Sequence, residues 1–215
     1  ADLSLLGASV TFETPLVDDK LTSISSFRYR NNSLFVNSKQ IETNFRPTFI
    51  DFQTYLSYEA SDKLKLNFLG NFSLNDYNYK PISRSTRFGT VADPLELNVY
   101  YSGEEQDNYL TMFGAFSSDY QVNNNLSFTG TISRYNTQEE EHYDIAAAYR
   151  LGEVDANIGS ENFGNVDFSE GIGSQLNHAR NDLDALITNA QIKGKYRVNR
   201  MQFDFGVKIQ KEDIR

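Results

Sequence analysis

Cysteine and histidine, which supply thiol and imidazole chemistry, are absent or scarce in this chain of 215 residues. The absence of cysteine excludes a thiol nucleophile, a thiolate metal site and a disulfide within it. His142 and His178 are the two imidazoles available as bases or metal ligands, and each stands among polar residues, as surface histidines do. The sequence contains neither a serine nucleophile elbow nor a phosphate-binding glycine loop. We therefore predict that the chain is not an enzyme.

Two groups of carboxylates could bind a hard cation such as calcium through their oxygen atoms. The first group is Glu139, Glu140, Glu141 and Asp144, and the second is Asp155, Glu161, Asp167 and Glu170. Neither group has the spacing of a calcium-binding loop. We interpret both as solvated acidic segments, and we expect no metal and no other cofactor.

The charge balance argues against a nucleic-acid partner. The chain has 20 Lys and Arg residues against 29 Asp and Glu residues, for a net charge of -9, whereas phosphate binding depends on Lys and Arg. Apolar residues make up 39% and the mean hydropathy is -0.52, which is low for a chain that buries a large core. Much of the chain should therefore face water. No apolar run is long enough for a membrane-spanning helix.

Side chains alternate between apolar and polar with a period of two along most of the chain, which indicates β-strands. In one clear run, Met201, Phe203 and Phe205 alternate with Gln202 and Asp204. The alternation predicts four hairpins, in which residues 5–16 pair with 21–30, 49–59 with 64–74, 110–120 with 126–135, and 186–198 with 201–209. We predict an all-β protein with about eight antiparallel strands.

The lengths of the connections reduce the number of possible folds further. Short turns near residues 18, 61, 123 and 199 alternate with long links at about 31–48, 76–108 and 136–185. An outer-membrane barrel has short periplasmic turns, longer external loops and strands of about 9 to 11 residues. A soluble sandwich usually has short connections at both ends. The pattern predicts that the strands of residues 1–215 belong to an antiparallel transmembrane β-barrel in the cell outer membrane, in contact with its lipid bilayer.

The link at 136–185 is the most unusual in composition. Its stretch from Tyr143 to Leu151 is strand-like, and we interpret it as an extension of the sixth strand beyond the membrane. A run rich in Gly, Asn and Asp follows, through Gly152 and Gly173, and predicts a folded external loop.

The alternation divides the strand residues between two faces. Apolar positions predicted to face lipid are Phe68, Phe72, Ile192, Phe203, Phe205 and Val207. Polar positions predicted to line the lumen are Gln53, Asn67, Asn71, Lys193, Lys195, Arg197, Asp204 and Lys208. This second set would contact a solute or an inserted plug domain, or would simply wet the lumen wall.

Three stretches carry a more specific pattern. Residues 20–30 read Lys-Leu-Thr-Ser-Ile-Ser-Ser-Phe-Arg-Tyr-Arg, residues 47–58 and 62–73 form the next hairpin, and residues 183–209 form another. These runs resemble barrel strands of TonB-dependent outer-membrane receptors of the Bacteroidetes type. The resemblance covers most of the chain and consists of strand patterns.

The resemblance implies a barrel of about 22 strands closed around an N-terminal plug domain. It also implies TonB as a partner and uptake of a scarce small nutrient as the function, without specifying whether that nutrient is a ferric chelate, a glycan or a peptide. The chain carries no plug domain and no TonB box, and its last residues, Glu212-Asp213-Ile214-Arg215, are strand-like in character. We therefore expect it to form part of a receptor barrel.

Two alternatives remain open from the sequence. The chain could be a complete eight-stranded barrel that acts as an adhesin or a structural protein of the outer membrane, with an interior filled by side chains. It could instead be a soluble β-sandwich that binds a glycan or a protein partner.

Overall fold

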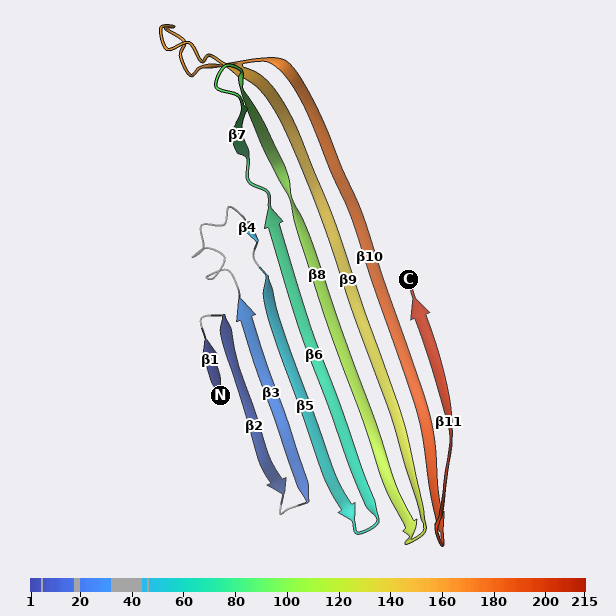
Figure 1. Cartoon of the computed structure of the whole chain (residues 1–215). Coiled ribbons are helices and arrows are strands. Elements are labelled where there is room, and N and C mark those ends of the chain that lie inside the picture. Colours follow the sequence, from blue (N-terminus) through green and yellow to red (C-terminus); the bar gives the residue numbers. More distant parts are fainter. Residues whose placement is uncertain (5, 18–19, 32–43, 46) are drawn as a thin grey trace.

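Figure 1 shows a computed structural model of the chain, which describes residues 1–4, 6–17, 20–31, 44–45 and 47–215. The described residues form one antiparallel sheet, and no helix occurs among them. The prediction of an all-β protein is therefore confirmed. Within these residues the sheet is open, because β1 and β11 stand at opposite ends of the strand order.

The strands follow one another as an up-and-down meander. Their bounds are β1 (Asp2–Ser4), β2 (Gly7–Val17), β3 (Leu21–Asn31), β4 (Asn44–Phe45), β5 (Thr48–Ser61), β6 (Leu64–Lys80), β7 (Arg84–Gly89), β8 (Pro94–Asn123), β9 (Leu126–Val154), β10 (Val166–Val198) and β11 (Met201–Ile214). The order across the sheet is β1-β2-β3-β5-β6-β8-β9-β10-β11, while the short β4 pairs with β6 and the short β7 with β8. Eight of the described strands have 11 residues or more.

The predicted hairpins are confirmed where they are described. Residue 52 pairs with residue 72, residue 116 with 132, residue 192 with 207, and residue 10 with 27. Two-residue turns join three of these hairpins at 62–63, 124–125 and 199–200. Asn199 takes a positive φ of 52°, a conformation that Asn tolerates better than most residues. The fourth turn, near residue 18, includes residues outside the described part.

The predicted long links at 76–108 and 136–185 are wrong in extent, because most of each is strand. β6 continues to Lys80, β7 follows, and β8 begins at Pro94. β9 extends to Val154, which confirms the predicted extension through residues 143–151, and β10 begins at Val166. The expected folded loop is therefore limited to residues 155–165. Most of the link at 31–48 lies outside the described residues.

The sheet is a single layer in the described part of the chain. Its buried apolar residues are the small Ala147, Val154 and Ala185, and no described side chain is fully enclosed. The three longest strands, β8, β9 and β10, continue well past the other long strands at one end of the sheet, where the short β7 lies beside β8 (Figure 1). No described helix has the length and apolar character needed to cross a membrane.

Candidate functional site

One face of the sheet carries most of the large exposed apolar side chains, and we call it the apolar face. A typical row across it runs Leu56, Phe68, Phe116, Ile132, Ala190 and Ile209, on six neighbouring strands. The predicted lipid-facing residues Phe68, Phe72, Ile192, Phe203, Phe205 and Val207 all lie on this face. Their side chains are open, with Ile192 62% and Val207 70% exposed.

The apolar side chains form a belt of limited height, which begins at the two-residue turns. On β6 it extends from Leu64 to Leu74, and on β8 from Tyr120 to Leu110. Ten steps of about 3.3 Å give roughly 33 Å along each of these strands.

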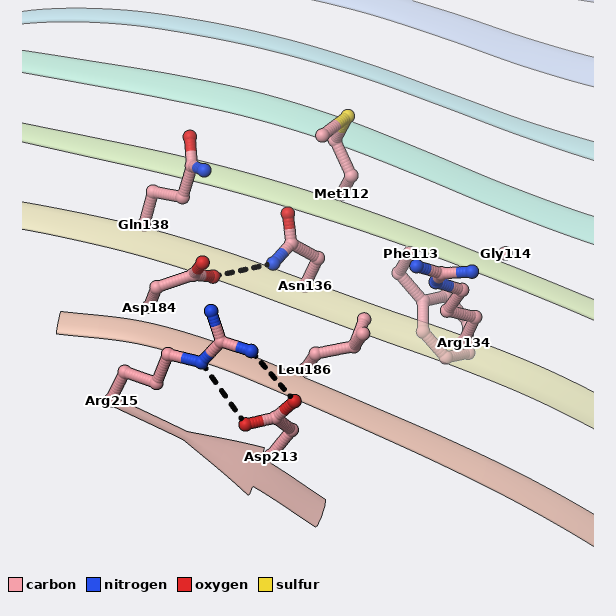
Figure 2. A pocket seen from close by; sticks show the side chains of 10 residues that line it. All are labelled: Met112, Phe113, Gly114, Arg134, Asn136, Gln138, Asp184, Leu186, Asp213 and Arg215. Atoms are coloured by element: carbon pink, nitrogen blue, oxygen red, sulfur yellow. Dashed lines mark hydrogen bonds and ion pairs between the residues drawn. The ribbon is translucent and has the colours of Figure 1, made fainter. Parts of the chain in front are cut away.

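At the border of the belt that lies farthest from the turns, which we call its upper border, the side chains of the same face become charged. On β9 to β11 this border has a depression of about 670 Å³, which is lined by Arg134, Asn136, Asp184, Asp213 and Arg215 together with Met112 and Leu186. Figure 2 shows Asn136 Nδ2 donating to Asp184 Oδ1 at 3.0 Å and Arg215 facing Asp213 at 3.3 Å. These residues were not among the predicted site residues.

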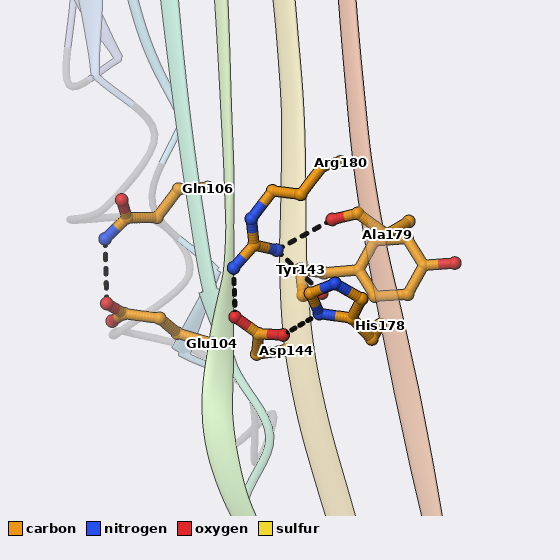
Figure 3. Close-up of polar contacts among 7 residues, drawn as sticks. All are labelled: Glu104, Gln106, Tyr143, Asp144, His178, Ala179 and Arg180. Carbon is orange, nitrogen blue, oxygen red and sulfur yellow. Dashed lines mark hydrogen bonds and ion pairs between the residues drawn. The ribbon is translucent and has the colours of Figure 1, made fainter.

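Directly beyond this border the same face is polar, and exposed apolar side chains such as Ile172 and Leu176 recur only farther along it. Figure 3 shows Asp144 between His178 Nδ1 and an Arg180 guanidinium nitrogen, both in contact with its carboxylate. These contacts lower the pKa of Asp144, the His178 hydrogen bond most and the Arg180 hydrogen bond next. Lys80 Nζ pairs with Glu104 Oε2 at 2.7 Å on the same face. The belt is therefore bounded by side chains that favour water.

The opposite, polar face carries every predicted lumen-lining residue. Gln53, Asn67, Asn71, Lys193, Lys195, Arg197, Asp204 and Lys208 all lie on it. On β9 its side chains are less exposed than those of the apolar face, since Thr131 and Ser133 are half-buried while Ile132 and Arg134 are exposed. The polar face is thus the more sheltered side of this part of the sheet.

Hydrogen bonds link the polar face across β3, β5 and β6 around Asp51, whose side chain is 7% exposed. Arg28 Nη2 lies 3.6 Å from Asp51 Oδ1, and its guanidinium also stacks 4.7 Å from the centre of the Phe49 ring. Gln53 and Asn71 both donate to Asp51 Oδ2. Two predicted lumen residues are therefore held by one buried carboxylate.

A second node joins β5, β6, β8 and β9 near the turns. Asn67 Nδ2 donates to Asp119 Oδ2 at 3.0 Å, and Thr129 Oγ1 donates to Asp119 Oδ1 at 2.7 Å. Ser57 Oγ donates to Asn67 Oδ1 at 3.0 Å. Both oxygens of Asp119 are thus occupied by donors from neighbouring strands.

The predicted lumen-lining lysines of β10 and β11, unlike the residues around Asp51 and Asp119, are not held by a carboxylate among the described residues. Lys193, Lys195, Lys208 and Asp204 line a depression of about 620 Å³. Gln202 Nε2 donates to Asp204 Oδ2 at 2.8 Å, and none of the three lysines forms an ion pair with another described residue. Three unpaired ammonium groups on one face require water or an anionic partner.

The acidic group of residues 139–144 is divided by the strand alternation. Glu139 and Glu141 lie on the polar face, whereas Glu140 and Asp144 lie on the opposite one. Among the described residues, no group of three or more potential ligands has an arrangement that could hold a metal ion.

Sequence reasoning missed one cluster, on the polar face just above the belt. It comprises three rows across β6, β8 and β9, and we call it the tyrosine–carboxylate grid: Asn75, Tyr109 and Glu139; Tyr77, Asp107 and Glu141; Tyr79, Glu105 and Tyr143. Its sequence signal is tyrosines at alternate positions of one strand and tyrosines with carboxylates at alternate positions of two others, which form a cluster only once the register is known.

Comparison with known proteins adds no relative: no protein family, no curated protein and no solved structure matches this chain.

Proposed function

We propose that this chain forms part of the wall of a transmembrane β-barrel in an outer membrane, with the apolar face toward lipid and the polar face toward a water-filled lumen. The function that fits best is uptake of a scarce nutrient by a receptor of the TonB-dependent class. The nutrient would pass along the polar face when the plug domain rearranges.

The observation that carries the proposal is the apolar belt. Side chains such as Phe205, which is 53% exposed, lie in rows across neighbouring strands, and no second layer of the described chain covers them. A continuous exposed apolar surface of this size marks contact with a membrane or a partner. Strands tilted as in a membrane barrel would give the belt a height of roughly 25 Å, which is that of the apolar band in such barrels, and its charged border also favours a bilayer.

The lysines of the polar face favour a barrel with a wide lumen, and receptors of this class have wide barrels. In a barrel of eight strands the interior is filled by side chains, so Lys193, Lys195 and Lys208 would need buried partners. Removing ammonium groups from water without partners is costly. A wide barrel leaves them in water or beside a plug domain, in line with the strand runs that resemble the receptor family.

A complete small barrel is the second candidate. The observation in its favour is that eight described strands are long enough to cross an outer membrane, the smallest number found in such barrels. It would act as an adhesin or a structural protein.

Fractionation of source cells tests both candidates. An antibody against residues 158–184 would report the compartment and the mass of the native protein. An outer-membrane band far heavier than the 24.5 kDa of this chain is expected for a receptor. A band near that mass in the same membrane would favour the small barrel, and a soluble band would contradict both.

A further inference from the structure

The tyrosine–carboxylate grid concentrates four carboxylates on one side of three adjacent strands. Strands lie about 4.8 Å apart and alternate residues about 6.7 Å apart, so the nine side chains span roughly 10 by 13 Å. In the central row, Asp107 stands between Tyr77 on β6 and Glu141 on β9. The carboxylates are Glu105, Asp107, Glu139 and Glu141.

No described Lys or Arg forms an ion pair with any of these four carboxylates. The hydrogen bonds that they accept come from hydroxyl groups: Tyr109 donates to Glu141 Oε1 at 2.8 Å, and Thr137 lies 3.4 Å from Glu139 Oε1. The negative charge of the grid is therefore not neutralised within the described residues.

Asp107 gives a second, independent indication of a ligand. It is 8% exposed, and its Oδ1 atom is enclosed without a hydrogen-bond partner. A buried carboxylate oxygen without a donor is unfavourable and uncommon. Burial raises the pKa of Asp107, and Glu141 raises it further, although His142 acts in the opposite direction. Burial likewise raises the pKa of Glu105, with Asp107 and Glu141 adding to the effect. A hydrogen-bond donor with a positive charge would provide the missing partner of Asp107 Oδ1. It would also lower the raised pKa values of Asp107 and Glu105.

The neighbouring side chains define the kind of cation. Four tyrosines share the grid with the carboxylates, and aromatic faces attract organic cations. A metal ion fits poorly, because the described ligands include no group arranged to hold one. Amine and guanidinium groups donate charge-assisted hydrogen bonds to carboxylates and also stack on aromatic rings.

We infer that the tyrosine–carboxylate grid binds the amine or guanidinium group of an organic cation, with Asp107 and Glu141 as its acceptors. The placement of the grid on the lumen side, directly above the membrane, rests on the proposed function. There it would select positively charged substrates at the outer mouth of the barrel.

Calorimetric titration of the full chain in detergent, with 1,5-diaminopentane as the probe, tests this inference. The neutral 1,5-pentanediol has the same length and serves as the control ligand. Asp107→Asn combined with Glu141→Gln keeps the shapes of both side chains and removes both charges. Glu140→Gln is the matched control variant, because Glu140 lies next to Glu141 on the opposite face.

We expect the diamine to bind and the diol not to bind. The double variant should lose at least about tenfold in affinity, the effect of one charged hydrogen bond, while Glu140→Gln should match the unmodified chain. Glu141→Gln alone, which keeps an acceptor for Tyr109, should show an intermediate loss and provides the test if the double variant does not fold.

Equal losses in Glu140→Gln and the double variant would overturn the inference, as would equal binding of diamine and diol, or binding of magnesium chloride in place of the diamine. The outcome is separable from the proposed function. An outer-membrane protein that ignores the diamine would refute the site alone, and a soluble protein that binds it would refute the barrel alone.

Discussion

The ring of Phe205 on β11 lies directly over Gly194 on β10, its cross-strand partner, so that a Cβ at position 194 would clash with the ring. In this position Phe205 also meets Phe128 edge to face, with ring centroids 6.1 Å apart. Gly130 on the same face has nothing within 4 Å of its own Cβ position. The glycine at 194 thus provides space for an aromatic contact that joins three strands.

Gly194→Ala should lower the free energy of unfolding by about 1 kcal/mol, since Phe205 must swing away from Phe128 and such aromatic pairs contribute about 0.5–1.5 kcal/mol. Gly130→Ala should be neutral or stabilising, because its methyl group enters open space. Urea titration in lipid vesicles compares the two. Equal effects at both positions would contradict the contact.

A charge on the apolar face should be costly if lipid covers it. Phe205→Arg should reduce the free energy of unfolding in vesicles by about 2–4 kcal/mol toward the bilayer centre. Lys208→Ala, on the polar face of the same strand, should change it by less than about 0.5 kcal/mol. If Phe205→Arg had no effect and Lys208→Ala were strongly destabilising, the assignment of the two faces would be wrong.

The Asp119 node should contribute more to stability than exposed charges nearby. Asp119→Ala leaves Asn67 Nδ2 and Thr129 Oγ1 without their acceptor, and we expect a loss of about 1–3 kcal/mol. Lys65 faces Glu59 at 3.9 Å with both side chains exposed, so Lys65→Ala should cost less than about 1 kcal/mol. The same vesicle titration measures both variants, and a larger loss in Lys65→Ala would argue against the node.

The contacts of Asp144 should make the outer part of β9 and β10 sensitive to acid. Because hydrogen bonds from His178 and Arg180 lower the pKa of Asp144, its stabilising effect is complete above the ordinary Asp pKa and is lost as the pH falls through the lowered value. The protection of amides in residues 142–151 and 172–180 against exchange, corrected for the intrinsic rate at each pH, should therefore fall in that acid range. Asp144→Asn should abolish this pH dependence, and an unchanged profile in the variant would contradict the assignment.

The two faces could be predicted from the sequence because the backbone of a strand fixes its side-chain period at two. Phe205 and Lys208 fall on opposite faces whatever the partners of β11 are. The turns at 62–63 and 199–200 could be placed for a similar reason, since the alternation stops on either side of short polar segments.

The lengths of β8, β9 and β10 could not be predicted in the same way. Above the belt both faces contain polar and apolar residues, as Tyr100 and Tyr101 illustrate on opposite faces of β8, so the alternation that marks a strand disappears while backbone pairing continues. The tyrosine–carboxylate grid was missed because Tyr77, Asp107 and Glu141 are far apart in sequence. They come together only through the register of three strands.

Site-directed spin labelling tests the central claim most directly, because the chain has no cysteine to remove. Single cysteines at 203, 205 and 207 and at 204 and 208 would carry a nitroxide in protein reconstituted into vesicles. We predict that labels at 203, 205 and 207 collide with oxygen dissolved in lipid, while labels at 204 and 208 collide with a water-soluble nickel complex. Access of the nickel complex to all five positions would contradict a lipid-facing belt.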